Sequence, residues 1–267
     1  MRLMVPLRPD PRAPLARVNP TARLAMALIF MAVAFASIDP LTPTLLLVVL
    51  LAAVPASGIR PLDLLVRAWP LLLAAAALAV LNALFAPAGS GAVLLRIGPV
   101  ELREEALVAG IAVGLRVLAV ALAGLIAVVA TDPTDLADSL QQQLGLSPRF
   151  AVGALAAVRL MPAIAHEWQT LRLARRARGV SAGRSPLAAV RIAAGQLLAI
   201  LVGAIRRATR LATAMEARGF ASRPCRTTAR PQAMERRDWL LLAGAAGIGA
   251  LAVTIGVVLG TWRFLIG

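Results

Sequence analysis

The chain has 267 residues, of which 60% are apolar and only 15% are charged. Soluble domains of this length are far more polar, so the composition excludes an ordinary soluble protein and predicts an integral membrane protein. All 28 basic residues are arginines, and 17 of them lie between Arg149 and Arg237 with only three glutamates. That basic stretch lies between hydrophobic segments and has few aromatic residues for stacking on bases. It therefore favours a cytoplasmic membrane-surface region over a nucleic-acid partner.

Missing residue types exclude several chemistries. The chain has no lysine, so it has no P-loop for ATP and no lysine for Schiff-base catalysis. Cys225 and His166 are the only residues of their kinds, and one copy of the chain cannot build a zinc site from them. We therefore expect no cofactor and no metal site.

Apolar runs predict five transmembrane helices in the lipid bilayer, at residues 24–38, 41–57, 68–88, 106–130 and 240–262. The first two are short for a hydrocarbon core of about 30 Å and need tilt or flanking residues to cross it. The fold class expected is an all-α integral membrane protein. Its predicted domains are a four-span membrane domain (1–130), a cytoplasmic helical region (131–237) and a final transmembrane helix (238–267).

Arginine placement predicts the orientation. Arg17 and Arg23 precede the first span, and Arg60 and Arg67 lie between the second and third spans, which places these flanks and the N-terminus in the cytoplasm. Arg116 lies inside the fourth span. A buried membrane charge faces a partner helix or a polar cavity, and we favour a role in packing or assembly.

Three segments after residue 131 carry signals for the start and end of a helix. Each begins with a capping residue followed by proline and ends with glycine, which predicts one short and two long helices. The segments run from Asp132-Pro133 to Gly145, from Ser147-Pro148 to Gly179, and from Ser185-Pro186 to Gly219.

The two long helices are expected to be roughly 45 to 50 Å long, with a kink in the first at Pro162. Apolar residues form one stripe along the second, comprising Leu187, Val190, Ala194, Leu197, Leu201, Ile205, Ala208, Leu211 and Met215. If the first helix crossed the membrane outward, a cluster of arginines would lie outside. We therefore expect both helices to lie along or dip into the cytoplasmic interface.

The two long helices end in the same tripeptide. Ala177-Arg178-Gly179 and Ala217-Arg218-Gly219 lie 40 positions apart. Arginine before a terminating glycine complements the helix dipole, which is ordinary helix-end chemistry. Two copies at the ends of two long helices also suit docking to carboxylates of a partner through the guanidinium fork.

Four motifs together resemble the transmembrane T component of energy-coupling factor transporters, including the cobalt and biotin uptake forms. The resemblance covers nearly the whole chain. It rests on residues 18–24 before the first span, on Arg159-Leu160-Met161-Pro162, and on the segments 174–179 and 214–220 that contain the two tripeptides.

The resemblance implies a scaffold role without enzyme activity in the bacterial plasma membrane. The expected partners are two cytoplasmic ATPase subunits, as a homodimer or heterodimer, and a substrate-binding membrane subunit for a vitamin or a transition-metal ion. Arg178 and Arg218 would dock the ATPases, while Ala177, Gly179, Ala217 and Gly219 would shape the helix ends. The two long helices would be coupling helices. The resemblance assigns no role to residues 223–237.

Two other functions are weighed against this one. Asp132, Asp135 and Asp138 are spaced to bind magnesium-diphosphate, as in intramembrane prenyltransferases, although the other acidic cluster, Glu101, Glu104 and Glu105, is predicted on the opposite side. A stand-alone secondary transporter needs polar residues at mid-membrane, and Asn82 and Arg116 are the candidates.

Overall fold

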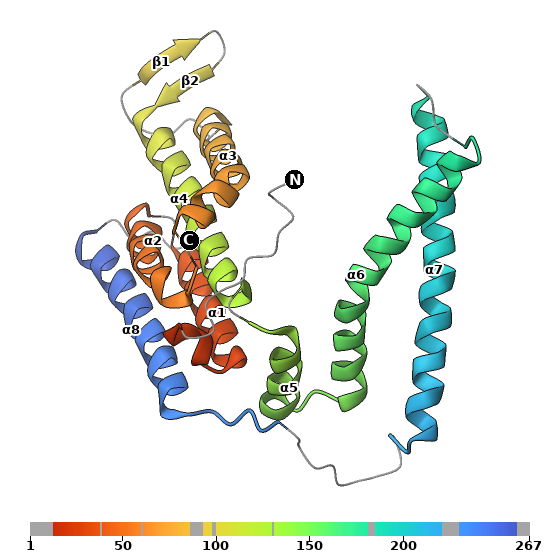
Figure 1. The fold of residues 1–267 in the computed structure, drawn as a ribbon. Coiled ribbons are helices and arrows are strands. Elements are labelled where there is room, and N and C mark those ends of the chain that lie inside the picture. The colour runs from red at the N-terminus through yellow and green to blue at the C-terminus, as the bar shows by residue number, and fades with distance from the viewer. Residues whose placement is uncertain are drawn as a thin grey trace. The chain divides into compact units, whose positions relative to one another are not determined.

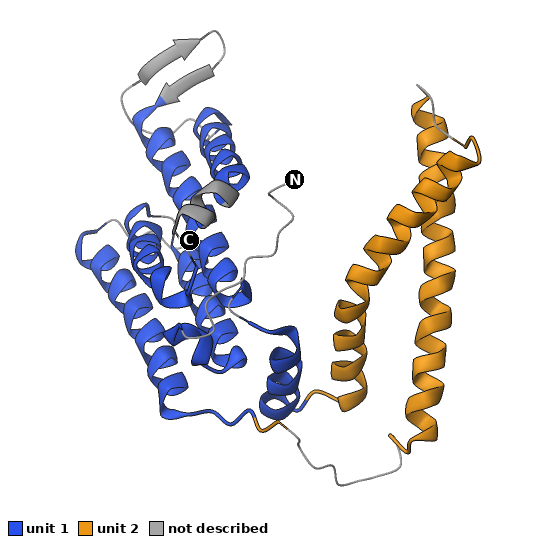
Figure 2. Ribbon diagram, viewed as in Figure 1, with its two compact units in different colours: residues 1–145, 232–267 blue, residues 146–231 orange. Residues whose placement is uncertain are grey.

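The chain forms two compact units in a computed structural model, which describes residues 13–37, 39–59, 61–85, 93–97, 100–129, 131–180, 185–220 and 230–260. The membrane unit comprises residues 1–145 and 232–267, and the coupling unit comprises residues 146–231 (Figure 2). The two units are defined by which residues pack together, and this division does not indicate on which side of the bilayer a residue lies. The predicted domain boundaries at 130/131 and 237/238, which concern that side, therefore stay predictions.

Six α-helices and one hairpin make up the described part of the membrane unit (Figure 1). Two short 3-10 turns, η2 (Pro14–Arg17) and η3 (Pro55–Ser57), accompany them. The elements are α1 (Pro20–Ala36), α2 (Leu41–Ala53), α3 (Pro61–Phe85), β1 (Val93–Ile97), β2 (Val100–Arg103), α4 (Glu104–Val129), α5 (Pro133–Leu144) and α8 (Arg236–Val258).

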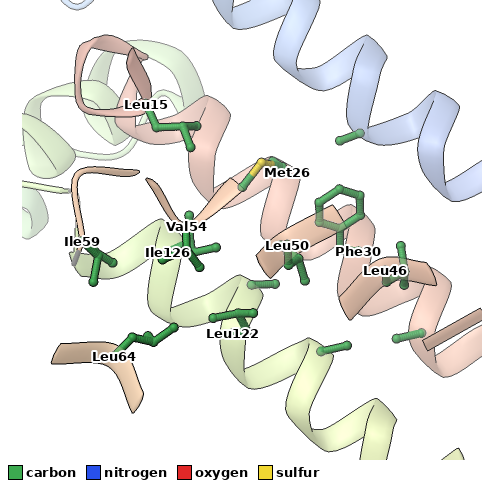
Figure 3. Close-up of a cluster of buried hydrophobic side chains, with 14 residues drawn as sticks. Leu15, Met26, Phe30, Leu46, Leu50, Val54, Ile59, Leu64, Leu122 and Ile126 are labelled. Carbon is green, nitrogen blue, oxygen red and sulfur yellow. The ribbon is translucent and has the colours of Figure 1, made fainter. Parts of the chain in front are cut away.

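Helix α4 is the centre of the membrane unit, because α1, α2 and α3 all pack against it. Its Leu122 and Ile126 lie among apolar side chains of the preceding helices (Figure 3). The surrounding buried residues include Met26, Phe30, Leu46, Leu50 and Val54. Helix α8 packs against α1 and α2, so the last helix of the chain returns to the first two.

Glycines let α3 and α4 approach closely. A Cβ atom added at Gly110 would lie 2.4 Å from the Ala79 carbonyl oxygen, and one added at Gly114 would lie 3.0 Å from the Ala79 Cβ. Ala75 and Ala83 line the same contact. Small residues at an interface are the usual means of packing helices in a membrane, where the lipid supplies no hydrophobic drive.

A hairpin of β1 and β2 joins α3 to α4. The strands pair in antiparallel fashion, with Ile97 opposite Val100, Arg96 opposite Glu101 and an irregularity between Val93 and Leu95. The predicted spans at 68–88 and 106–130 left residues 89–105 without a predicted element, so these strands are an addition. The aliphatic run preceding Gly98-Pro99 is the signal that could have indicated them.

The coupling unit consists of two long helices, α6 (Pro148–Ala177) and α7 (Pro186–Ala217). They run antiparallel, and α6 bends along its length while α7 is straighter (Figure 1). Pro162 lies within α6. Two polar contacts join the helices: Arg207 donates to Glu167 Oε2 at 2.7 Å, and Arg175 donates to the Ile192 carbonyl at 2.9 Å.

The predicted helical membrane-protein fold is confirmed, but the helices long enough to span a bilayer are not all the ones predicted as spans. Within the described ranges, five helices are long and apolar enough to cross a bilayer by length and composition: α3, α4, α6, α7 and α8. The first two predicted spans correspond to α1 and α2, which are shorter, with 17 and 13 residues. The interfacial location expected for α6 and α7 therefore stays a prediction.

Candidate functional site

The carboxyl end of α6 closes in a hydrogen-bonded glycine cap. The Gly179 N–H donates to the Arg176 carbonyl at 3.0 Å, and the Val180 N–H donates to the Arg175 carbonyl at 3.0 Å. Gly179 has a φ of 76°, in the left-handed region. This pair of bonds is the Schellman arrangement, in which a glycine with positive φ satisfies the last carbonyls of a helix.

The end of α7 repeats that geometry. The Gly219 N–H donates to the Glu216 carbonyl at 2.9 Å, the Phe220 N–H donates to the Met215 carbonyl at 3.0 Å, and Gly219 has a φ of 71°. Glycine is required at both positions because a Cβ is disfavoured at positive φ. The repeated tripeptide therefore encodes one local structure twice.

Arg178 and Arg218 occupy equivalent places in these caps. Each is the C-cap residue, with φ of −88° and −84°, and each is exposed. Because α6 and α7 are antiparallel, the two arginines lie at opposite ends of the helix pair (Figure 1). The arrangement offers two separate guanidinium groups, each on a rigid helix end, to carboxylates of other proteins.

Serine, aspartate and proline fix the amino ends of the three helices that follow α4. The Asp132 carboxylate accepts from the Thr134 N–H at 2.7 Å and caps α5. Ser147 accepts from the Phe150 N–H, and Ser185 from the Ala188 N–H, at the starts of α6 and α7. Pro133, Pro148 and Pro186 follow the caps in the first turn of each helix.

Most of the apolar stripe of α7 is exposed, and its second half, from Ile205 to Met215, lines an open groove toward α6. The α7 residues buried in the structure are Gln196 and Ile200, which lie off the stripe. Stripe residues Leu197, Leu201 and Ile205 are 60%, 55% and 57% exposed. The stripe is therefore not tightly covered within the coupling unit, and it is available to lipid or to another protein.

An apolar groove of about 560 Å³ lies between the first half of α6 and the second half of α7. Its polar groups are Arg149 and Glu216. The other lining residues are Val152, Gly153, Ala156, Ala157, Leu160, Ile164, Ala204, Ile205, Ala208, Leu211, Ala212, Met215 and Phe220.

Arg116 contacts the carboxyl end of α1. Its Nε donates to the Ala34 carbonyl at 2.8 Å, and its guanidinium also donates to the Ser37 carbonyl. Arg116 is 9% exposed. The last carbonyls of a helix have no partner within it, so Arg116 supplies donors that α1 lacks. These bonds join α4 to the end of α1, and the packing or assembly role expected for Arg116 stays a prediction.

The prenyltransferase hypothesis finds no support in the described residues. Asp132 is engaged as a helix cap. Across the described residues, no three histidine, cysteine or acidic side chains gather where they could hold a metal ion. The Glu101 side chain lies outside the described part of the chain.

Sequence analysis did not predict two polar contact sets. One is the Glu167–Arg207 ion pair between α6 and α7. The other surrounds Asn19, whose side chain accepts from the Thr21 N–H at 2.9 Å and donates to the Gln232 carbonyl at 3.1 Å. Asn19 belongs to the motif before the first span, but nothing in that motif indicates a partner more than 200 residues away.

Comparison with known proteins identifies the family. The profile of the CbiQ family, described as cobalt transport protein, matches residues 11–228. The energy-coupling factor transporter transmembrane protein EcfT of Exiguobacterium sibiricum is 31% identical over 173 residues, which cover 61% of this chain and 65% of that relative. The EcfT protein of Bacillus selenitireducens is 26% identical over 235 residues, covering 85% of this chain and 87% of that relative.

A third similarity is of another kind. A protein of Bifidobacterium longum, whose name assigns it to the ABC transporter ATP-binding proteins, is 25% identical over 245 residues. The match covers 89% of this chain but only 31% of that larger protein. The family profile matches most of the chain, and the motifs quoted for the resemblance lie within it. The chain therefore belongs to the CbiQ and EcfT family of multi-pass transmembrane components of energy-coupling factor transporters.

Proposed function

We propose that this chain couples ATP hydrolysis by two cytoplasmic ATPase subunits to movement of a separate substrate-binding membrane protein, without catalysing a reaction itself. The observation that carries the proposal is the pair of identical glycine caps on α6 and α7, each with an exposed arginine. Two equal ends suit two like partners. The antiparallel helices separate these ends by roughly 45 Å, about the length of a 30-residue helix, which leaves room for one ATPase at each.

The larger Bifidobacterium longum protein supports the ATPase partnership. About a third of its length resembles this chain, and its name is that of an ATP-binding protein. A membrane region of this kind and an ATP-binding function therefore occur in one polypeptide there. In this chain, which has no lysine for a P-loop, the same partnership requires separate subunits.

The exposed stripe of α7 supports the second partnership. Large apolar side chains on a cytoplasmic helix need lipid or protein cover, and Leu197, Leu201 and Ile205 are more than half exposed. We assign the stripe to contact with the substrate-binding membrane subunit at the bilayer surface. The cargo class is a vitamin or a transition-metal ion, and the family description names cobalt.

The proposal includes a location and an orientation. The chain lies in the bacterial plasma membrane with its N-terminus and its coupling helices on the cytoplasmic side. The positive-inside bias supports this orientation, since 17 of the 28 arginines lie between Arg149 and Arg237.

Charge reversal at both helix ends tests the ATPase docking. The Arg178→Glu/Arg218→Glu variant is expected to lose copurification with its ATPases while keeping its membrane yield and melting temperature. Both side chains are exposed, so their reversal changes the docking surface and not the packing. Arg172→Glu/Arg210→Glu is the matched control, with the same charge change at exposed positions away from the caps. Undiminished copurification of the first variant would contradict the proposal.

A further inference from the structure

The chain leaves the membrane unit after Gly145 and returns to it at Gln232. At the return, side chains of the membrane unit bind both main-chain groups of Gln232. Its N–H donates to Gln142 Oε1 at 2.8 Å, and its carbonyl accepts from Gln143 Nε2 at 2.7 Å and from Asn19 Nδ2 at 3.1 Å. The end of α5 and the returning chain are therefore tied together next to the point where the chain departs.

Asn19 is itself firmly held. Its backbone N–H donates to Asp238 Oδ1 at 2.8 Å, and its side-chain oxygen accepts from the Thr21 N–H and the Ser139 hydroxyl. Asn19 is 6% exposed, Asp238 is 3% exposed and Ser139 is fully buried. These partners belong to α1, α5 and α8, so Gln232 is attached to a base that three helices share.

Water would satisfy the main chain of an exposed connection equally well. The bond from Gln143 is exposed, so it contributes little net stability, but it fixes where the returning chain lies. An untied return would absorb a displacement of the coupling helices. A return held at Gln232 passes the displacement to the helices that hold it.

We propose that Asn19, Gln142 and Gln143 form a clamp on Gln232 that positions the coupling unit and transmits its nucleotide-driven displacement to α1, α5 and α8. The three are positioning residues and contact neither nucleotide nor cargo. This inference rests on the proposed function, because it needs ATPases that move the coupling helices.

The variant Asn19→Asp/Gln143→Glu removes both side-chain bonds to the Gln232 carbonyl, and Asn19→Asp also costs stability because it buries a carboxylate near Asp238. Aspartate keeps the side-chain oxygen that caps α1, but it places a carboxylate oxygen where Nδ2 donated to the Gln232 carbonyl. Glutamate makes the same exchange at position 143. Gln141→Glu is the control, because it adds the same negative charge in the same turn of α5 at a residue that makes none of the bonds to Gln232. Gln143→Glu alone changes only a solvent-exposed hydrogen bond, so among these variants it should disturb folding least.

Two measurements on the complex with its ATPases test whether the clamp forms and whether it transmits the displacement. The Gln232 N–H keeps its own acceptor, Gln142 Oε1, in the double variant, but loss of both bonds to its carbonyl frees the residue, so hydrogen exchange at this amide is expected to be about tenfold faster, equivalent to about 1.4 kcal/mol. Spin labels at Leu173→Cys and Val128→Cys, in a Cys225→Ser background, report the change in distance between the two units on ATP binding. The double variant is expected to lose that change while copurifying with the ATPases at wild-type yield, and Gln141→Glu is expected to keep it.

Each contrary result overturns a different claim. Unchanged exchange at Gln232 would show that no clamp exists in solution. Faster exchange with an undiminished ATP-dependent distance change would remove its role in transmission. A joint fall in melting temperature and ATPase yield, seen also in Gln143→Glu alone, would make the contacts a stability element and overturn the positioning role. Failure of the wild-type chain to copurify with ATPases would instead refute the proposed function, and this inference with it.

Discussion

The membrane unit packs around a buried apolar cluster, whereas the coupling unit leaves most of its side chains exposed. The buried apolar cluster belongs to the membrane unit. Within α6 and α7, which are described in full, only Ala151, Gln196 and Ile200 are buried. The sequence of the membrane unit thus determines how its helices pack on one another. The sequence of the coupling unit determines where its two helices begin and end, and lipid or partner proteins must cover their exposed faces.

The glycine interface between α3 and α4 should give the largest effect if packing holds the membrane unit together. Gly110→Leu places side-chain atoms where a Cβ alone would lie 2.4 Å from the Ala79 carbonyl, so we expect loss of folded protein, since overpacking costs about 1–3 kcal/mol or more. Gly124→Leu, in the same helix with nothing within 4 Å of its added Cβ, should be tolerated. Yield and melting temperature in detergent give the comparison. Equal behaviour of the two variants would contradict the packing account.

Arg116 allows a second test of the membrane unit. Arg116→Met leaves the Ala34 and Ser37 carbonyls without their donor, and each unsatisfied buried group costs about 1–3 kcal/mol. We expect a melting temperature clearly below that of the wild type, with Arg116→Lys in between because it retains a single cationic donor group. A methionine variant as stable as the wild type would show that the contact with α1 contributes nothing.

The helix caps should show smaller and more local effects. Gly179→Ala forces an L side chain to a φ of 76° and should cost about 1 kcal/mol, which would fray the last turn of α6. Gly153→Ala, inside the same helix with open space around it, should stabilise α6 by about 0.5–1 kcal/mol. Hydrogen exchange along α6 measures both. Effects of the same sign would mean that the cap geometry does not govern the end of the helix.

The smallest effect is expected from the ion pair between the coupling helices. Glu167 and Arg207 are each about a third exposed, so solvent screens their attraction and the pair should contribute less than about 1 kcal/mol. A double-mutant cycle with Glu167→Gln and Arg207→Gln, followed by thermal unfolding, measures the coupling. A coupling energy of several kcal/mol would show that α6 and α7 hold each other more firmly than their burial indicates.

Local signals in the sequence predicted the helices after α4 closely. Asp132, Ser147 and Ser185, each followed by proline, and the three terminating glycines define α5, α6 and α7 to within a residue or two, because caps and prolines act through neighbouring atoms. The early start of α3 at Pro61 was missed, because the apolar run that indicates a span begins only at Ala68.

Contacts between distant residues were beyond sequence reasoning. The Arg116 position indicated a partner helix, but not the α1 carbonyls that it binds. The apolar stripe of α7 was recognised as a face, yet periodicity does not say what covers a face, and in the structure most of the stripe stays exposed. The tie between Asn19 and Gln232 joins residues 213 positions apart, and no local pattern encodes it.

The most direct test of the central claim is labelling of Arg178→Cys and Arg218→Cys, each in a Cys225→Ser background, with a membrane-impermeant maleimide. No labelling is expected in intact cells. After permeabilisation, both positions should react when the ATPases are absent and should be protected when the ATPases are bound. Reaction of either cysteine from outside intact cells would place that helix end on the wrong side of the membrane and contradict the account.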